Sequence, residues 1–417
     1  MPKGLDIEHH TLMRERLYGS IHSFWYNLND QEYALYDILS MTKVEVDEIR
    51  FATTRIGHIF FKTAKLLRRS NDNTLKQLDI PGEILPFIRH KALPVESVIS
   101  RVDLVKTKDG LKVLELNADT PTFEKEVFHI NNVVSKHFGM LDPNKGLEGV
   151  LGKEIQRAII ECHLRTQQEH DPYVVFTSHD DHVEDRETTT YLMNLSAIST
   201  SYIPLHKLHI VKNKGLFDDE GRKIDVLYRQ TYPLEHLIDD QDTTSKEKVG
   251  LQLLELVVAG KLSMLNPISS FLLQSKAVQS VIWGMMELGH TFFSEEEREW
   301  IRTYFLPTYL EKDPFITNGI RYVKKPSFGR EGDTVEIFEK NQKIEEDVNK
   351  TYKDSLPVYQ QYVDLPTQPI STTSGIRDSK LLIGSFLVNG RASGIGFRAG
   401  NQITDNNAYF LPVGIRL

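Results

Sequence analysis

Four polar side chains in the segment 101–117 are of types that could bind a metal ion and an anion together. Arg101 and Asp103 lie on the strand-like stretch RVDLVK, and Glu115 and Asn117 lie on the next stretch, KVLELN. Carboxylate and amide oxygens are hard ligands that suit Mg²⁺ bound with the phosphates of a nucleotide. The adjacent arginine could hold a substrate anion. An ordinary solvated strand face with paired charges is the alternative interpretation.

A hairpin would bring these four residues to one face of a sheet. The stretches are separated by Lys108, Asp109 and Gly110, which is typical of a three-residue loop ending in a glycine with positive φ. The pairing of Thr107 with Leu111 then places the two acids opposite each other, and the arginine opposite the asparagine. Because side chains alternate along a strand, all four share one face.

A second candidate site lies in the segment YVKKPSFGREGDTVEIF, residues 322–338. A predicted strand carries Lys324 and Lys325, and Gly329 and Gly332 then bracket Arg330. Such a loop lets backbone N–H groups approach phosphate oxygens while cationic side chains offset the charge. The spacing matches neither a P-loop nor G-x-G-x-x-G, so a glycine-rich hairpin with surface lysines remains an equal alternative.

A third polar cluster lies near the C-terminus, where Arg398 in GIGFRAG is followed by ITDNN at 403–407. Taken alone, this pattern is more typical of a turn than of a site. The sequence has no G-x-S-x-G motif, which removes the most recognisable hydrolase signature.

Hydropathy patterns divide the chain into three expected regions. Residues 1–90 are predicted to form a helical segment that packs on the core. In residues 91–245 the hairpin is followed by strand-like stretches that alternate with helices such as 147–160, which favours an α/β class. A polar stretch at 239–248 is a candidate hinge, and residues 246–417 end in a strand-rich tail.

Length and composition indicate a folded protein of two to three domains. The 417 residues are 40% hydrophobic and 26% charged, with a formal net charge of -8, which argues against nucleic acid as the main partner. A single cysteine, a start without a secretory signal and the absence of 18 consecutive apolar residues predict a cytoplasmic protein without a membrane span. The sequence does not indicate an oligomeric state.

Six motifs occur in the order R-x-D, L-E-L-N-A-D-T-P-T, N-P-x(8)-K, K-K-P-x-x-G-R-E-G, V-Y-Q-Q-Y and G-x-G-x-R with I-T-D-N. Together they resemble the glutathionylspermidine synthase family from about residue 20 to the C-terminus. The resemblance implies an ATP-grasp fold in permuted order, with metal ligands before the nucleotide lysines. Helices at the N-terminus and a pre-ATP-grasp-like α/β region would precede the nucleotide-binding region. Bifunctional members carry an N-terminal cysteine amidase domain, whose hydrolytic activity is not expected here.

The resemblance also implies roles for individual residues in binding ATP and Mg²⁺. Asp103, Glu115 and Asn117 match the metal ligands, in agreement with the hairpin pairing. Lys276, in NPISSFLLQSK, and Lys325 match the two lysines that hold nucleotide phosphates.

Arginines and glutamines of the motifs complete the implied nucleotide site. Arg330, beside Gly329, matches the arginine of the mobile glycine loop that closes over the phosphates. Arg101 matches the arginine that contacts an acyl phosphate, and Arg398 a second arginine near the transferred phosphoryl group. Gln360 and Gln361 fall in the segment that holds the adenine.

The substrate side of the resemblance is less close. Thr120 and Thr122 lie where family members place hydroxyls against the acid substrate, although serine is the expected residue there. Glu184 and Asp185 occupy the approximate place of an acidic pair that attracts the cationic amine.

The resemblance therefore implies an ATP-dependent carboxylate–amine ligase that forms an amide through an acyl phosphate. Its small-molecule substrates would be a peptide or amino-acid carboxylate and a polyamine or other amine. A ligase for amino acids or peptides unrelated to glutathione is a further option. The alternative from another class is a non-catalytic ATP-binding or scaffold protein that retains the fold.

Overall fold

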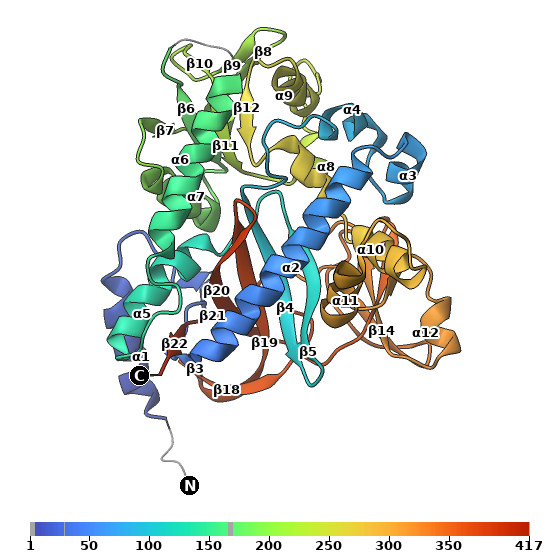
Figure 1. The fold of residues 1–417 in the computed structure, drawn as a ribbon. Coiled ribbons are helices and arrows are strands. Elements are labelled where there is room, and N and C mark those ends of the chain that lie inside the picture. Colours follow the sequence, from blue (N-terminus) through green and yellow to red (C-terminus); the bar gives the residue numbers. More distant parts are fainter. Residues whose placement is uncertain (1–4, 29, 166–169, 417) are drawn as a thin grey trace.

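A six-stranded antiparallel sheet forms the centre of the molecule in the computed structural model, which describes residues 5–28, 30–165 and 170–416 (Figure 1). Five strands follow the order β21-β20-β19-β4-β5, and β18 also pairs with β19. The sheet therefore joins the predicted hairpin to the C-terminal tail. Its strands are β4 (Ile99–Thr107), β5 (Gly110–Asn117), β18 (Thr367–Thr372), β19 (Gly375–Val388), β20 (Arg391–Gly400) and β21 (Tyr409–Leu411).

The predicted hairpin forms, but its loop is one residue shorter than predicted. Thr107 pairs with Gly110 instead of Leu111, and the Thr107 hydroxyl accepts a hydrogen bond from the Asp109 N–H at 3.1 Å. A β-bulge at Leu114 then adds one residue to β5. The bulge restores the predicted pairs in the site: Asp103 faces Glu115, and Arg101 faces Asn117.

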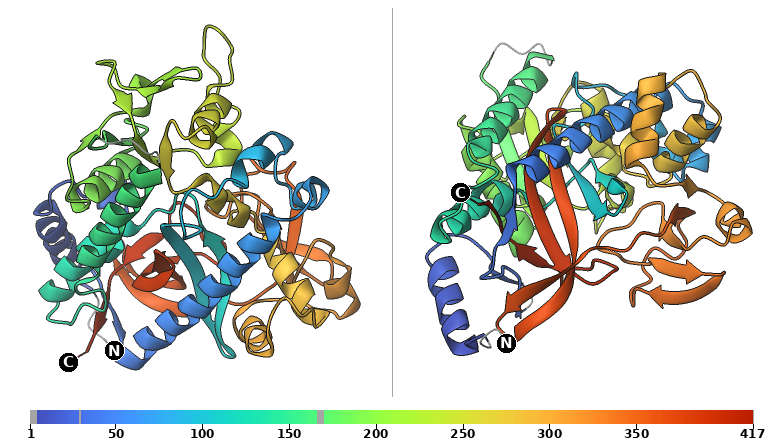
Figure 2. Two further views of the ribbon diagram at one scale, coloured as in Figure 1. Left: turned by 45° about the horizontal axis from the view of Figure 1, so that its top comes forward. Right: turned by 60° about the horizontal axis from the view of Figure 1, so that its bottom comes forward.

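Helix α2 (Lys43–Leu67) lies across one face of this sheet, as two views agree (Figures 1 and 2). Thr42 and Glu45 form a capping box that satisfies backbone N–H groups at its start. The buried side of the helix consists of apolar residues at spacings of three and four, including Ile49, Ile56 and Phe60. The hydrophobic contact with the strands fixes the sheet from behind the site.

The rest of the N-terminal segment contains both helices and short strands. The helices are α1 (Ile7–Gly19), α3 (Asp72–Gln77) and α4 (Leu85–Ile88), and the strands are β1 (Asn27–Leu28), β2 (Gln31–Glu32) and β3 (Leu39–Met41). Strand β3 pairs in parallel with β22 (Val413–Ile415), so the N-terminal segment is tied to the last strand of the chain. The expected division at residues 90 and 245 stays a prediction.

A four-stranded parallel sheet with the order β12-β11-β6-β7 forms a second layer, at the top of Figure 1. Its strands are β6 (Val174–Ser178), β7 (Thr200–Tyr202), β11 (Val226–Gln230) and β12 (Ser263–Leu265), and its neighbouring helices are α6 (Leu147–Arg165), α7 (Val183–Leu195), α8 (Leu234–Leu237) and α9 (Val249–Val258). Helix α5 (Asn131–His137) contacts β22 instead. Every residue of β6 and β11 is buried, as expected for a parallel sheet covered by helices. A small sheet of β8 (His209–Val211), β9 (Gly215–Phe217) and β10 (Lys223–Ile224) lies at its edge.

A third, five-stranded antiparallel sheet has the order β13-β17-β14-β15-β16 and lies in the orange part of Figure 1. Its strands are β13 (Thr308–Tyr309), β14 (Tyr322–Pro326), β15 (Glu336–Glu339), β16 (Gln342–Glu346) and β17 (Pro357–Gln361). The nearby helices are α10 (Val278–Glu287), α11 (Glu295–Tyr304) and α12 (Asp313–Thr317). None of the described helices is long and apolar enough to cross a membrane.

Candidate active site

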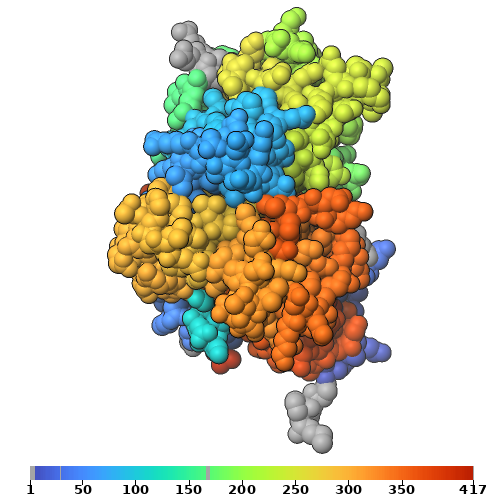
Figure 3. Space-filling view, turned by 90° about the vertical axis from the view of Figure 1, so that its right-hand side faces the viewer, coloured from blue at the N-terminus to red at the C-terminus, as the bar shows by residue number. Residues whose placement is uncertain are grey.

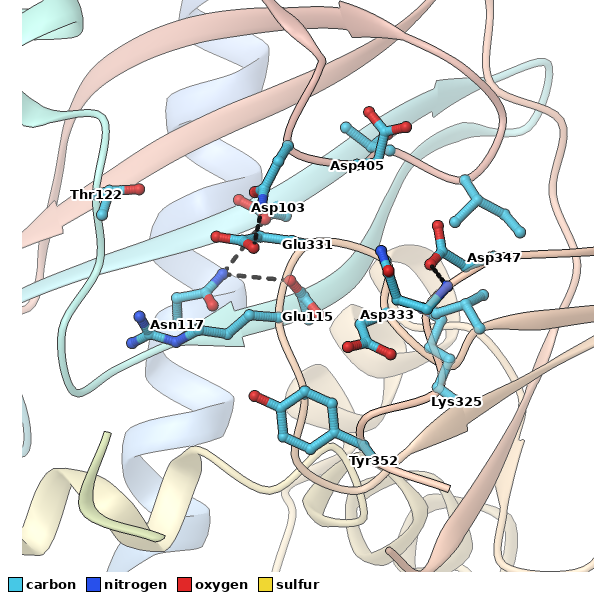
Figure 4. Close-up of a pocket in the computed structure, with 18 of the residues that line it drawn as sticks. Asp103, Glu115, Asn117, Thr122, Lys325, Glu331, Asp333, Asp347, Tyr352 and Asp405 are labelled. Atoms are coloured by element: carbon cyan, nitrogen blue, oxygen red, sulfur yellow. Dashed lines mark hydrogen bonds between the residues drawn. The ribbon is translucent and has the colours of Figure 1, made fainter. Parts of the chain in front are cut away.

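The four polar residues of the hairpin lie together on one face of the central sheet. Arg101 donates two hydrogen bonds to the Asp103 carboxylate, at 2.7 and 3.0 Å. The Asn117 amide nitrogen lies 3.3 Å from Asp103 Oδ2 and 3.4 Å from Glu115 Oε1. Figure 4 shows the two carboxylates and the amide pointing toward one another. Period-two alternation on paired strands thus collects the oxygen donors.

Burial and neighbouring cations shift the pKa values of Asp103 and Glu115 in opposite directions. Burial raises the pKa of Asp103, although the Arg101 guanidinium opposes this effect. Burial would also raise the pKa of Glu115, but Lys276, Lys325 and Arg101 outweigh it and lower the pKa to about 2. Glu115 is therefore ionised at neutral pH and is surrounded by cations.

Two lysines reach this cluster, Lys276 from the turn before α10 and Lys325 from β14. The Lys276 ammonium lies 3.3 Å from Glu115 Oε2 and donates to the Gly329 carbonyl at 2.8 Å. Lys325, on β14, donates to Gln360 Oε1 at 2.8 Å. Burial lowers the pKa of Lys325 to about 8, partly offset by the attraction of Glu115. Both ammonium groups are thus held next to the carboxylate cluster.

The two glutamines expected at the adenine differ in their positions. Gln360 is buried, and its amide nitrogen donates to Gln279 Oε1 and Thr308 Oγ1, both at 3.3 Å. The Gln360 side chain therefore orients Lys325. Gln361 lines the adjacent cavity.

The glycine loop between β14 and β15 brings Arg330 to Thr120, which lies three residues after the end of β5. Gly329 and Gly332 have φ angles of +150° and +74°, and a Cβ atom at either would lie within 3 Å of another residue. Only glycine fits both requirements. The Arg330 guanidinium donates to the Thr120 hydroxyl and, at 3.2 Å, to its carbonyl oxygen.

Two further arginines of the site, Arg398 and Arg101, each donate a hydrogen bond to a backbone carbonyl oxygen. Arg398, on β20, donates to the Asp405 carbonyl oxygen at 2.9 Å. Arg101 donates to the Thr122 carbonyl oxygen at 2.8 Å, in addition to its bonds with Asp103. Their guanidinium groups are thereby fixed while both residues line the same space.

An acidic wall lies where α7 begins. The half-buried Glu184 and Asp185 lie in the first turn of α7, and Asp185 forms an ion pair with His182 at 3.2 Å. Burial, followed by the charges of Glu126 and Asp185, raises the pKa of Glu184 to about 8. Glu124 is fully buried with both carboxylate oxygens lacking a hydrogen-bond partner outside its own residue.

One cavity of about 930 Å³ lies between these elements, lined by strands of the central and third sheets and by the loops that follow β6 and β11. Lys324 of the second candidate site does not line it and instead donates to Glu336 at 3.0 Å. The predicted residues that do line it are Arg101, Asp103, Glu115, Asn117, Thr120, Thr122, Glu184, Asp185, Lys276, Lys325, Gly329, Arg330, Gln360, Gln361 and Arg398. The volume suits a ligand larger than one small metabolite. The arrangement combines anionic oxygen donors, cationic groups and an acidic wall in one space.

The donor chemistry fits a divalent cation. Among the described residues, no group of three or more histidine, cysteine, aspartate or glutamate side chains could hold a metal ion, so a site here needs the Asn117 amide. Asp103, Glu115 and Asn117 supply two carboxylates and an amide oxygen, the ligand set that Mg²⁺ prefers. The amide would turn its oxygen toward the ion.

Several buried polar residues that position the site were not expected from the sequence. Asn266 accepts from the Val98 and Ile99 N–H groups at 2.8 and 3.1 Å and donates to the Asp119 carbonyl at 2.7 Å. It thus ties the start of β4 to the end of β5. Its position directly before the proline of the N-P-x(8)-K motif is the only sequence signal for this role. Arg229 forms a fully buried ion pair with Asp119.

Comparisons with known proteins agree with this geometry. The family model of the glutathionylspermidine synthase pre-ATP-grasp region matches residues 13–416. A Haemophilus influenzae protein named "Putative acid--amine ligase" is 25% identical over 344 residues, covering 75% of this chain and 73% of that protein. A glutathione synthetase-like effector from Globodera pallida, solved in the apo form, covers 100% of this chain and 98% of its own, with a TM-score of 0.60 and 14% identity. The mixed α/β, ATP-grasp fold expected from the sequence is confirmed. The chain belongs to the glutathionylspermidine synthase pre-ATP-grasp family.

Proposed function

We propose that the protein is an ATP-dependent ligase that joins a carboxylic acid to an amine and releases ADP and phosphate. The observation that carries this proposal is the convergence of Asp103, Glu115 and Asn117 with Lys276 and Lys325 on one cavity. Two carboxylates beside two lysines are of little use for binding a neutral ligand. The carboxylates suit a divalent cation, and the lysines suit the phosphates of a nucleoside triphosphate that binds with it.

Magnesium bound to Asp103, Glu115 and Asn117 would neutralise phosphate charge. The two lysines would hold the phosphates of ATP, and the Arg330 guanidinium would close over them from the glycine loop. Lys276 donates to the Gly329 carbonyl, so the loop and this lysine already form one unit.

Activation of the acid is the chemical reason for using ATP. A free carboxylate does not react with an amine at neutral pH because its oxygen is a poor leaving group. Attack of the carboxylate on the γ-phosphorus gives an acyl phosphate and ADP, and attack of a neutral amine then releases phosphate. Arg101 and Arg398, whose guanidinium groups are fixed by carbonyl oxygens, would stabilise the oxyanion and the departing phosphate.

The acidic wall supports binding of a cationic amine. Glu184 lines the cavity, and the buried Glu124 and Glu126 lie behind it. Burial raises the pKa of both Glu124 and Glu126 and so favours their neutral forms, which leaves Glu184 as the group that attracts the amine. An ammonium group that approaches would favour the ionised form of Glu184 and lower its pKa from about 8. Thr120 and Thr122 would contact the acid substrate on the opposite side of the reacting centre.

The proposal is tested by incubating the protein with ATP, Mg²⁺ and pooled acids and amines. Release of ADP and phosphate that requires both an acid and an amine, with a product of the condensed mass, would support the ligase. Bound ATP without ADP release in any pool would favour the scaffold alternative. The mass of the product identifies the acid and the amine.

A further inference from the structure

We infer that Asp79, in the N-terminal segment, is a positioning residue that holds the base of the glycine-loop flap, defined here as residues 328–355. Asp79 lies outside the cavity lining, two residues after the end of α3. This inference rests on the proposed ligase function for its kinetic consequences, but its structural part can be tested without turnover.

Both ends of the flap converge on one carboxylate oxygen. Asp79 Oδ2 accepts a hydrogen bond from the Ser327 hydroxyl, just before the flap, and one from the Leu356 N–H, just after it, at 3.0 Å. The Ser327 N–H also donates to the Leu356 carbonyl at 2.8 Å. The two chain ends are thus joined to each other and to a third segment. Figure 3 shows the blue N-terminal surface against the orange surface of the C-terminal half.

The same turn also holds the loop that carries Lys276. The Leu78 carbonyl accepts a hydrogen bond from the Ser275 hydroxyl at 2.9 Å, and the Lys276 N–H donates to the Ser327 carbonyl at 2.7 Å. Residues 78–79 therefore contact both segments that deliver phosphate-binding cations. Lys325 lies two residues before Ser327, so its strand is fixed at the same point.

The conformation of Asp79 requires a residue that tolerates a left-handed backbone. Its φ is +64°, in the region that asparagine, aspartate and glycine adopt most readily. Asparagine keeps a carbonyl oxygen at the same place, whereas glycine keeps only the backbone conformation. The pair Asp79→Asn and Asp79→Gly thus separates the hydrogen-bond acceptor from backbone strain.

The positioning role has a chemical consequence. An acyl phosphate hydrolyses when water reaches it, so a flap with a loose base would let the intermediate react with water. ATP would still bind through Lys276 and Lys325. Loss of the Asp79 acceptor should therefore uncouple ADP formation from amide formation more than it weakens ATP binding.

The first experiment is hydrogen exchange on the full chain without substrates. We expect the Leu356 amide and peptides from 328–355 to exchange at least about tenfold faster in Asp79→Gly, because the hydrogen bonds that Ser327 and Leu356 donate to Asp79 are both lost. Asp79→Asn should exchange like the wild type. Asn213→Gly, at a surface turn with φ +60°, is the control for adding a glycine and should leave the flap unchanged. Unchanged exchange of the flap in Asp79→Gly would overturn the inference, whether or not a ligase substrate is found.

The second experiment is kinetic and compares ADP released with amide formed. Asp79→Gly is expected to release at least about twice as much ADP per amide and to lower the ligation kcat about tenfold, with an unchanged KM for ATP. Asp79→Asn should restore coupling. Equal losses in both variants, or a loss confined to the KM for ATP, would refute the role of the acceptor oxygen.

Discussion

Replacement of Glu115 by glutamine tests the electrostatic design of the site. The change keeps the size of the side chain and one oxygen acceptor but removes the negative charge. Lys276 would keep its position 3.3 Å away without a counter-charge, and Lys325 would lose the attraction that supports its protonated form. Asp103 would remain as a carboxylate already bound by Arg101 at two points.

The magnitude follows from the pKa of Glu115. A fall from 4.5 to about 2 corresponds to about 3 kcal/mol of favourable interaction for the ionised form. Because the folded-state pKa is depressed, this contribution is fully present above pH 4.5 and is lost as the pH falls toward 2. Glu115→Gln should therefore lower the free energy of unfolding by about 3 kcal/mol at pH 7, and the difference from wild type should shrink below pH 4.5.

Urea unfolding at pH 7 and at pH 3.5 measures this difference directly. Glu339→Gln is the matched control, because Glu339 pairs with Arg321 at 2.7 Å on the surface, where such a pair contributes little. In the ligase assay, Glu115→Gln should also need a higher Mg²⁺ concentration and lose about a hundredfold in kcat/KM for ATP.

Two results would refute the reasoning. Equal stabilities of Glu115→Gln and wild type at pH 7 would show that the lysines do not stabilise the ionised carboxylate. An unchanged Mg²⁺ requirement, with the stability loss present, would leave the ion cluster intact but remove Glu115 from the proposed metal site.

Three further substitutions address the lid, the nucleotide lysine and the acidic wall. Arg330→Ala should lower the ligation rate about a hundredfold while calorimetry shows a much smaller loss in ATP affinity, and equal losses would exclude a lid role. Wild-type kcat/KM for ATP should decline as the pH rises through about 8, where Lys325 loses its proton, and a pH profile of Lys325→Arg should lack this decline. Glu184→Gln should raise the KM for a cationic amine about tenfold above pH 8, where Glu184 is ionised, without a change in the KM for ATP in initial-rate measurements.

Local patterns in the sequence were sufficient for the four polar residues of the hairpin, whereas Lys276, Gln360 and Glu184 were expected only from the family resemblance. Alternation along two short strands placed Asp103 and Glu115 on one face, and this held although the predicted Thr107–Leu111 pair was wrong. The bulge did leave a local sign, since apolar residues alternate at Leu111 and Val113 and then change phase at Leu114, but the predicted register did not use it. The pairing at the site was correct because two errors cancelled: the loop is one residue shorter than predicted, and the bulge at Leu114 adds one residue to β5.

Positioning residues were not predictable in the same way. Asp79 and Ser327 are 248 residues apart, and Asn266 binds backbone groups 147 to 168 residues away. A polar side chain that bonds to a distant main chain leaves no periodic pattern in its own neighbourhood. Such residues look like turn or surface positions until the chain is folded.

The division between rigid and movable parts of the site follows from where each group is carried. The oxygen donors lie on β4 and β5, and β4 is paired on both sides inside the central sheet, so their spacing is set by two ladders of backbone hydrogen bonds. Arg330 lies on a loop whose glycines permit rearrangement, and that loop touches Thr120 through a side chain alone. A site that must admit two substrates and then exclude water needs both properties, and the placement of Asp79 at the base of the flap supplies the boundary between them.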